Sequence, residues 1–470
     1  MKSKPRKTRY HSMVSRRDFM KLLGVGTGVA ALGGVATKGY SDFDGMMASE
    51  FSERRLPFWV KEVDQPTVEI DWDVYRQFPH AGATLFNPNV YGMDEYMAMM
   101  GKNIENARQN ILSNSPTRTL KDHALHDANS WGWDTLPPPW TGPVMQSDPT
   151  MALRMTPQEL DVPRYEGSPE ENSRMIRTAA RIFGAFDVGF VKLNQRTKKL
   201  LYGNILFQDV DEGFDPGDGT LVLPDKDLWV IVAGMPQSLM LGQANNLGGT
   251  YSLAYSMTTI YSNRILAFLR GIGYQGYGGS TATVGIAPGF GVMAGLAEYG
   301  RTGQMVSPIV GNMFRTVMLS ITDLPLAETK PIDAGILNFC KTCKKCAENC
   351  PSGALNTADE PDWIDDVPPW QSTYGVKGYK VDTRKCFTQM FTNNPACGVC
   401  QSVCPFSKFD KAAIHDVIRA TVGTTSAANS LIANLDDTFG YGLKSPEEGA
   451  NIWDMDPWDV PIYGLDSSRS

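Results

Sequence analysis

The sequence predicts an α+β fold in which a large core precedes a smaller, cysteine-rich part. Helical and strand patterns follow one another without the regular alternation of a doubly wound sheet. All eight cysteines of the 470-residue chain lie between residues 340 and 404. The content of 42% hydrophobic and 20% charged residues is that of an ordinary globular protein, which argues against a disordered chain.

The first 37 residues are predicted to be an export signal. They contain eight Lys or Arg and one acidic residue, then an apolar run from Leu22 to Ala36 that is short for a membrane span of about 20 residues. The segment "SRRDFMK" around Arg16 and Arg17 resembles the twin-arginine signal, which directs folded proteins to export. The alternative is a basic arm followed by a helix of small residues. Gly34-Val35-Ala36 offers a small-x-small cleavage site.

The rest of the chain is acidic. Its formal charge is −14, because the whole chain carries −7 and the first 37 residues contribute +7. An acidic body disfavours nucleic acid as a partner. No later segment reaches a spanning length, so a soluble or peripherally attached protein is expected.

Residues 38–165 are dense in Pro and Trp and show few sustained periods, so we expect an irregular region that wraps the core. A helix is predicted from Pro169 to about Phe186, because Ser168 and Glu171 form a capping box around Pro169. Strands are predicted at 186–193, 198–207 and 227–235, and a long helix at 251–274 that closes at Gly271. The glycines that follow do not fit G-x-G-x-x-G after a strand, which excludes a dinucleotide site.

The cysteines form two sets, each with a last cysteine followed by proline. "CKTCKKCAENCP" matches the run of bacterial ferredoxins, in which the fourth cysteine ligates the other cluster. The second set departs from this pattern, because ten residues separate Cys386 from Cys397. We therefore expect two [4Fe–4S] clusters, with Cys386 in some doubt and a three-iron cluster as an alternative. Zinc and disulfides are disfavoured by the interlocked C-P pattern. The predicted ligands are Cys340, Cys343, Cys346 and Cys404 for the first cluster, and Cys350, Cys386, Cys397 and Cys400 for the second.

Five segments in this order resemble the catalytic subunit of respiratory corrinoid-dependent reductive dehalogenases: "SRRDFMK", "PEENSRMIRTAARIFGA", "AGLAEYGRTG", "TDLPLAETKPIDAGILNFCKTCKKCAENCP" and "CGVCQSVCP". The resemblance covers residues 165–410 and the signal. It implies a nitroreductase-like, corrinoid-binding core fused to a ferredoxin-like domain with two [4Fe–4S] clusters. The expected parts are a twin-arginine signal peptide (1–37), an N-terminal wrapping region (38–165), the catalytic core (166–335), the ferredoxin-like domain (336–415) and a C-terminal tail packing on the core (416–470).

The resemblance also implies site residues. Tyr255 falls at the family's proton-donating tyrosine and Arg315 at the basic residue that holds the tyrosine's charge. Gly278, Gly279, Ser280 and Thr281 are candidate corrinoid contacts, although such glycines also serve tight turns. Tyr251, Tyr255, Thr259 and Ser262 share a helical face, which lines a cavity or forms a solvated edge.

The corrinoid is expected to lack a protein ligand to cobalt. Consistent with this, the chain has no D-x-H-x-x-G segment, through which many corrinoid enzymes supply a histidine. Besides His11 in the signal, the histidines are expected to be surface or core residues rather than ligands; they are His80, His123, His126 and His415.

The leading hypothesis is a reductive dehalogenase that removes halide from a small organohalide with the Co(I) of a corrinoid, as terminal reductase of organohalide respiration. It would work at the outer face of the cytoplasmic membrane, attached through a small integral-membrane anchor protein and fed by an upstream respiratory donor. Two alternatives are an exported iron–sulfur electron-transfer protein without a substrate, and an enzyme similar to epoxyqueuosine reductases. The acidic body and the signal disfavour the tRNA substrate of the latter.

Overall fold

The computed structural model describes most of the chain between residues 56 and 460. The described ranges are 56–57, 59–79, 91–123, 156–243, 251–278, 284–365, 374–393, 397–407, 413–426, 429–430, 432–433, 443 and 445–460. The predicted signal peptide and its cleavage site therefore lie outside the described residues.

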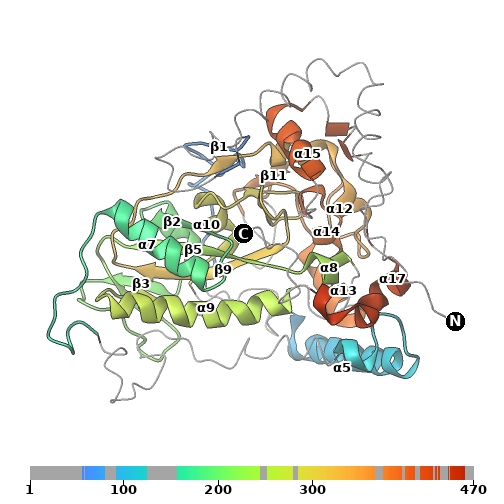
Figure 1. Cartoon of the computed structure of the whole chain (residues 1–470), viewed down its shortest axis with the longest axis horizontal. Helices are drawn as coiled ribbons and strands as arrows, with labels where there is room; N and C mark the ends of the chain where they lie inside the picture. Colours follow the sequence, from blue (N-terminus) through green and yellow to red (C-terminus); the bar gives the residue numbers. More distant parts are fainter. Residues whose placement is uncertain are drawn as a thin grey trace.

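A four-stranded antiparallel sheet forms the centre of the core (Figure 1). Its strand order is β2 (Asp187–Lys192), β5 (Trp229–Pro236), β9 (Phe314–Thr322) and β6 (Gly276–Tyr277). The register is regular between β2 and β5, and it shifts between β5 and β9 at Ala233 and Met235. An antiparallel sheet with helices that do not alternate regularly with its strands agrees with the α+β prediction.

One face of the sheet is covered by two helices, α7 (Pro169–Ile182) and α9 (Ser252–Gly271), as Figure 1 shows. Alternate residues of β5, such as Trp229, Ile231 and Ala233, point to this face, as the two-residue period of a strand requires. Both predicted helices are confirmed. The capping box of α7 is complete, because Ser168 and Glu171 each accept the other's backbone N–H.

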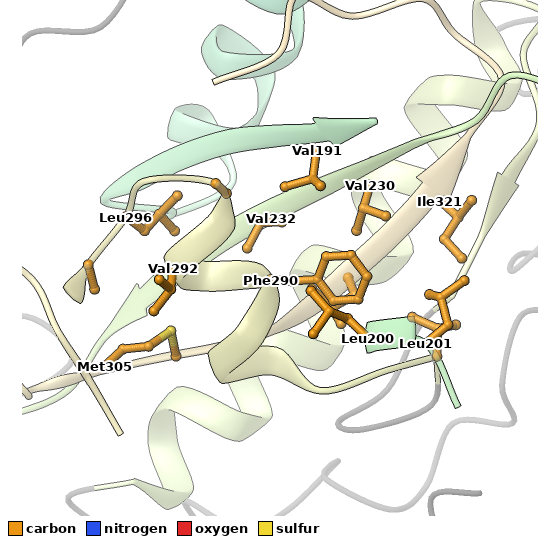
Figure 2. Packing of buried hydrophobic residues seen from close by; sticks show 14 of the residues in the cluster. Val191, Leu200, Leu201, Val230, Val232, Phe290, Val292, Leu296, Met305 and Ile321 are labelled. Carbon is orange, nitrogen blue, oxygen red and sulfur yellow. The ribbon is translucent and has the colours of Figure 1, made fainter. Parts of the chain in front are cut away.

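The other face packs against α10 (Ala287–Met293) and the chain that leads to it. Figure 2 shows Phe290 and Val292 of α10 against Val230, Val232 and Ile321 of the sheet. Gly278, at the end of β6, has a φ of +124° and lies so close to β9 that a Cβ would fall 2.3 Å from the Leu319 carbonyl. This glycine is therefore needed by the sheet itself.

Two sequence expectations need correction. The segment predicted as a strand at 198–207 starts as a 3₁₀ helix, η3 (Thr197–Leu200), and becomes a strand only at β3 (Ile205–Gln208). The cause is local, because the Asn194 side chain accepts the backbone N–H groups of Arg196 and Thr197 and begins a helical turn. The region 38–165 is also not irregular throughout, since it contains the 20-residue helix α5 (Met93–Leu112).

The cysteine-rich part is built of short helices beside one end of the sheet (Figure 1). They are α11 (Ile336–Thr342), α12 (Lys345–Glu348), α13 (Thr383–Asn393), α14 (Val399–Ser402) and η4 (Pro405–Ser407). Helix α5 packs along α13, and α15 (Ala413–Thr424) packs on α11. The N-terminal region and the tail thus both contact the cysteine-rich part, while the domain boundaries given above stay predictions.

The remaining elements are short. They are β1 (Lys61–Glu62), β4 (Leu221–Pro224), α8 (Leu239–Gln243), β7 (Glu298–Tyr299), β8 (Met305–Val306), β10 (Ile332–Asp333), β11 (Asp362–Trp363), β12 (Lys377–Gly378), α17 (Pro446–Ala450), η5 (Asn451–Asp454) and η6 (Pro457–Asp459). Across the described ranges, none of the helices combines the length and apolar character needed to span a bilayer.

Candidate active site and cysteine groups

The first cysteine group comprises Cys340, Cys343, Cys346 and Cys404. Cys340 lies on α11, Cys343 follows it, Cys346 lies on α12, and Cys404 reaches the group from just before η4. Together these four side chains line one small cavity. The chain after Cys404 is held close by Gly311, where a Cβ would fall 2.3 Å from the Phe406 backbone.

Electrostatics show the same grouping. Burial raises the pKa of Cys346, and the nearby thiols of Cys340, Cys404, Cys400 and Cys343 raise it further. Burial likewise raises the pKa of Cys340 to about 12, and Cys404 and Cys343 add to the shift. Four thiolates in one buried place repel one another, so they need a cationic centre to stay ionised.

The second cysteine group comprises Cys350, Cys386, Cys397 and Cys400. Burial raises the pKa of Cys400, and Cys386, Cys397 and Cys350 are the thiols that raise it further. Cys386 lies on α13, which runs to Asn393, so seven of the ten residues before Cys397 belong to this helix. The long spacing that put Cys386 in doubt is therefore compatible with its place in the group.

Cys350 has a different environment from the other thiols. Although burial raises its pKa, the net shift is downward, because the Ser352 hydroxyl and backbone N–H groups of residues 352, 354 and 355 stabilise the thiolate. The Ser352 hydroxyl lies 3.4 Å from the sulfur. These hydrogen bonds favour the thiolate, which is the form of cysteine that binds metals.

The two groups adjoin each other. Cys346 of the first group and Cys350 and Cys400 of the second pack against one apolar cluster, Ala347, Leu355 and Val381. None of the eight cysteines forms a disulfide. Within the described ranges, no three His, Cys, Asp or Glu side chains converge closely enough to bind a single metal ion. Two groups of four cysteines, of which the first lines one small cavity, match the number of ligands that two [4Fe–4S] clusters need.

Two buried charged residues brace the helix that carries the first group. Glu298 accepts backbone N–H groups of Ala334, Ile336 and Leu337 at the start of α11, and the Thr67 hydroxyl at 2.7 Å. Burial raises the pKa of Glu298, while the hydrogen bonds from Thr67 and α11 oppose that rise. Arg301 donates to the Cys340 carbonyl at the other end of the same helix. A carboxylate at the start of a helix and a cation at its end both favour the helix dipole.

Tyr255 and Arg315, predicted from different parts of the chain, lie together. Tyr255 lies in the first turns of α9, and Arg315 lies at the start of β9 beside the end of β5. The guanidinium carbon is 5.6 Å from the Tyr255 ring centroid and 5.9 Å from that of Tyr251, and the two rings meet edge to face at 6.0 Å. One cation thus serves two phenols, of which Tyr251 is buried and Tyr255 half-buried.

Arg315 is held from behind by Gln237, which follows β5 and is 1% exposed. Arg315 Nη1 donates to Gln237 Oε1 at 3.0 Å and to the carbonyl of the preceding residue, Phe314, at 3.1 Å. Its buried Nε donates to no described residue. A buried donor without an acceptor next to a half-buried phenol fits a site at which another group binds.

The catalytic candidates lie next to the second cysteine group. Arg315 is close enough to Cys400 to oppose the rise of that thiol's pKa, and Cys397 and Cys386 act on Tyr251. Helix α8, which follows Gln237, packs on α14, which carries Cys400. Arg315 therefore lies at the end of the sheet from which α8 leads to the second group.

The other predicted residues are placed only in part. Gly278 is described and contacts β9, whereas Gly279, Ser280 and Thr281 lie outside the described residues. Tyr251, Thr259 and Ser262 are buried, so the hydroxyl-bearing face of α9 is not a solvated edge. His80 and His126 are also outside, His123 is half-buried, and for His415 only the backbone of α15 is described.

Sequence reasoning assigned no role to Gln237, Glu298 or Arg301. For the last two a signal was present, since "AGLAEYGRTG" sets an acid and a base in an otherwise apolar, glycine-rich segment. Charges in such a setting are expected to be buried and paired with backbone groups. Gln237 has no comparable signal, because a lone glutamine after a strand is common.

Comparison with known proteins gives matches over most of the chain. The model of the family described as "Reductive dehalogenase subunit" matches residues 55–205 and 202–326, and that of the "4Fe-4S double cluster binding domain" matches 339–407. The chain is 29% identical to a chloroethene reductive dehalogenase of Dehalococcoides mccartyi strain VS, covering 98% of this chain and 99% of the relative. It is 27% identical to a trichloroethene reductive dehalogenase of Dehalococcoides mccartyi strain 195, covering 95% and 97%.

A solved structure is similar in fold. It is a reductive dehalogenase described in terms of B12-dependent dehalogenation, with a TM-score of 0.54 and 20% identity. The match covers 83% of this chain and 50% of the other, so this chain spans about half the length of that protein.

Proposed function

This chain belongs to the reductive dehalogenase family and carries a double [4Fe–4S] domain, and from that premise we propose that it removes halide from a small organohalide. The reaction consumes two electrons and one proton: the carbon–halogen bond breaks, a carbon–hydrogen bond forms and halide leaves. One observation supports this most directly. The phenol of Tyr255 lies beside the Arg315 guanidinium, at the end of the sheet from which α8 leads to the helix that carries Cys400.

We propose a corrinoid as the third cofactor. The similar solved structure is described as B12-dependent, and this chain lacks the D-x-H-x-x-G segment, so no such histidine is available to ligate cobalt. When bound, a corrinoid supplies the reduced cobalt at which the carbon–halogen bond is cleaved. The buried Nε of Arg315 and the half-buried Tyr255 fit a bound group on this side of the sheet. Gly279, Ser280 and Thr281 remain candidate contacts for its nucleotide tail. A nitroreductase-like core, which such a cofactor implies, is part of the proposal.

Tyr255 is proposed as the proton donor. Its hydroxyl gives up the proton that the product needs, and the phenolate that remains is paired by the Arg315 guanidinium nearby. Arginine suits this role because it stays charged in a poorly solvated site. Gln237 keeps the guanidinium from turning away from the two rings.

The cysteine groups give the electrons a direction. We propose that the second cluster, held by Cys350, Cys386, Cys397 and Cys400, delivers electrons to the reaction, because Arg315 acts on the pKa of Cys400 and α8 packs on the helix that carries this cysteine. The first cluster, held by Cys340, Cys343, Cys346 and Cys404, passes electrons to the second, because Cys346 and Cys400 pack on the same apolar cluster.

The cellular setting is also a proposal. The twin-arginine motif at Arg16 and Arg17 supports export after folding, which allows both clusters to be inserted beforehand. The mature chain would then work at the outer face of the cytoplasmic membrane, attached through a small integral-membrane anchor protein. An upstream respiratory donor would reduce it as the terminal reductase of organohalide respiration.

Halide release tests the function. The anaerobically purified chain, reconstituted with iron, sulfide and a corrinoid, should release chloride from chlorinated ethenes when given a low-potential donor. Chlorinated ethenes come first because the two relatives that cover nearly the whole chain are named for them; alkanes, arenes and brominated analogues follow in the same panel. Full iron and sulfide loading without corrinoid binding or halide release would favour the electron-transfer alternative. Reduction of epoxyqueuosine in a tRNA stem-loop, without halide release, would favour the other.

A further inference from the structure

Arg301 is a fully buried cation with an unusual set of partners. Only 1% of the residue is exposed, and its guanidinium stacks 3.9 Å from the centroid of the Tyr379 ring. Nε donates to the Cys340 carbonyl at 3.0 Å, and Nη1 donates to the carbonyls of Asn356 and Ala358 at 2.8 and 2.7 Å. The side chain thus joins the helix that starts the first cysteine group to the segment that follows the cysteine run.

The charge of Arg301 is not cancelled by an acid. It forms no ion pair with any residue that the structure describes, and all its hydrogen-bond acceptors are backbone carbonyls. Asp359, whose pKa Arg301 helps to lower after the larger effect of Lys344, is exposed and already ion-paired with Lys344. A full positive charge therefore remains in a poorly solvated place, where its field is weakly screened.

This charge lies at the wall of the first cysteine group. Arg301 lines the same small cavity as Cys340, Cys343, Cys346 and Cys404. A cluster held by four thiolates becomes more negative on reduction, and net charge and hydrogen bonding near the sulfurs set its reduction potential. A buried cation at that distance stabilises the reduced form more than the oxidised form.

We propose that Arg301 is a positioning residue for the first cluster that also raises its reduction potential: its guanidinium fixes the Cys340 carbonyl and places an unpaired positive charge in the wall of the cavity. The positive charge of the guanidinium and its several N–H donors make separate contributions to the site. The charge sets the potential, and the several hydrogen bonds fix the loop that holds the iron. The inference rests on the cluster part of the proposed function and needs neither substrate nor corrinoid.

The experiment is a redox titration followed by electron paramagnetic resonance. The full chain and its Arg301→Gln and Arg301→Lys variants are purified anaerobically and reconstituted with iron and sulfide only. A Cys386→Ser chain identifies the signal of the first cluster. Arg301→Gln should shift the potential of the first cluster to a more negative value and leave that of the second unchanged. Arg301→Lys keeps the charge, so its potential should stay near that of the wild type, whereas a chelator should remove its iron several-fold faster.

Arg419→Gln is the matched control. Arg419 is also fully buried, at 2% exposure, and donates to a backbone carbonyl, that of Ile309, but it does not line the cavity. Its loss should leave both potentials unchanged. An unshifted first cluster in a fully loaded Arg301→Gln chain, or an equal shift in Arg419→Gln, would overturn the proposal.

If Arg301→Gln does not retain iron, Arg301→Lys decides. A wild-type potential in the lysine variant then supports the role of the charge, and a clear negative shift refutes it. A wild-type chain that binds no clusters contradicts the proposed function instead, so the two failures are distinguishable.

Discussion

The two cysteine groups are of equal size but are built in different ways. Three sulfurs of the first group come from one short segment, and that segment is clamped by buried charges, Glu298 at the start of α11 and Arg301 at its end. The second group combines Cys350 with Cys386 on α13, Cys400 on α14 and Cys397 just before α14. Helix α5 packs against α13. The ion pair between these two helices, Arg384 with Glu95, is about half exposed. The first group is thus the more strongly supported by buried charges, whereas the second group lies closer to Arg315. The comparison teaches that two groups with the same number of sulfurs are supported by different means, buried charges at the first group and a neighbouring helix at the second.

Removing one ligand from each group should break the comparison most clearly. Cys400→Ser should abolish halide release, because the cluster nearest Arg315 is lost, while the first cluster is retained and stability falls less than in the matching variant of the first group. Cys343→Ser places a hydroxyl at a buried position in an apolar cluster, which should cost about 1–3 kcal/mol of stability in addition to the first cluster. Iron content, spectra and thermal unfolding measure both. Equal losses of stability would show that the groups are braced alike.

The two phenols beside Arg315 should differ next. Tyr255→Phe removes the proposed proton donor and should slow halide release by roughly 100- to 10,000-fold, with iron content unchanged. Tyr251→Phe is the matched control, because Tyr251 lies at a similar distance from the same guanidinium yet is buried. It should slow the reaction far less. Initial rates at saturating donor decide, and a Tyr251→Phe chain slower than Tyr255→Phe would reassign the donor.

The support of Arg315 should have an intermediate effect. Gln237→Leu removes the acceptor of a charged hydrogen bond, worth about 1.5–3 kcal/mol, so halide release should fall roughly 10- to 100-fold. Gln237→Glu keeps an acceptor oxygen at the same reach and should retain most of the rate. The iron content of both clusters serves as the control, since neither variant removes a cysteine. A wild-type rate in Gln237→Leu would show that Arg315 is positioned by other contacts.

The smallest effect is expected at the outer support of the second group. Arg384→Met should cost less than about 1 kcal/mol, because exposed ion pairs are weak. Glu298→Gln places a side-chain NH₂ donor next to the backbone N–H donors of Ala334 and Ile336. It should lower the free energy of unfolding by about 1–3 kcal/mol. Denaturant unfolding of the two variants gives the comparison. A larger loss in Arg384→Met would place the stronger brace on the second group.

Much of this arrangement follows from local sequence patterns. The capping box at Ser168 and the cysteine spacings depend on neighbouring residues, so the sequence predicts them directly. Helix α5 escaped prediction because its apolar residues do not gather on one buried face: Met93, Met97 and Ile104 are exposed, and Met99 is the residue that is buried. Its place is determined by contacts with α13, such as Tyr96 against Phe391, which are almost 300 residues away.

The pair proposed for catalysis shows the same limit. No spacing in the sequence brings Tyr255 to Arg315, because they meet only through the packing of α9 on the sheet. The resemblance to a family identified both residues as candidates. It assigned no role to Gln237, or to the two residues that hold α11, Glu298 and Arg301. Those residues act through backbone groups and a single side chain, and such partners leave no trace in spacing or periodicity.

The crossing of the two cysteine groups has a consequence for biosynthesis. In the sequence, all four cysteines of the second group lie between Cys346 and Cys404 of the first group. The first group is therefore completed only after the second. Neither site is therefore complete while the ribosome still holds residues up to 404. Both cofactors must be installed after translation of this segment, and a chain that ends before Cys400 lacks a sulfur of each site.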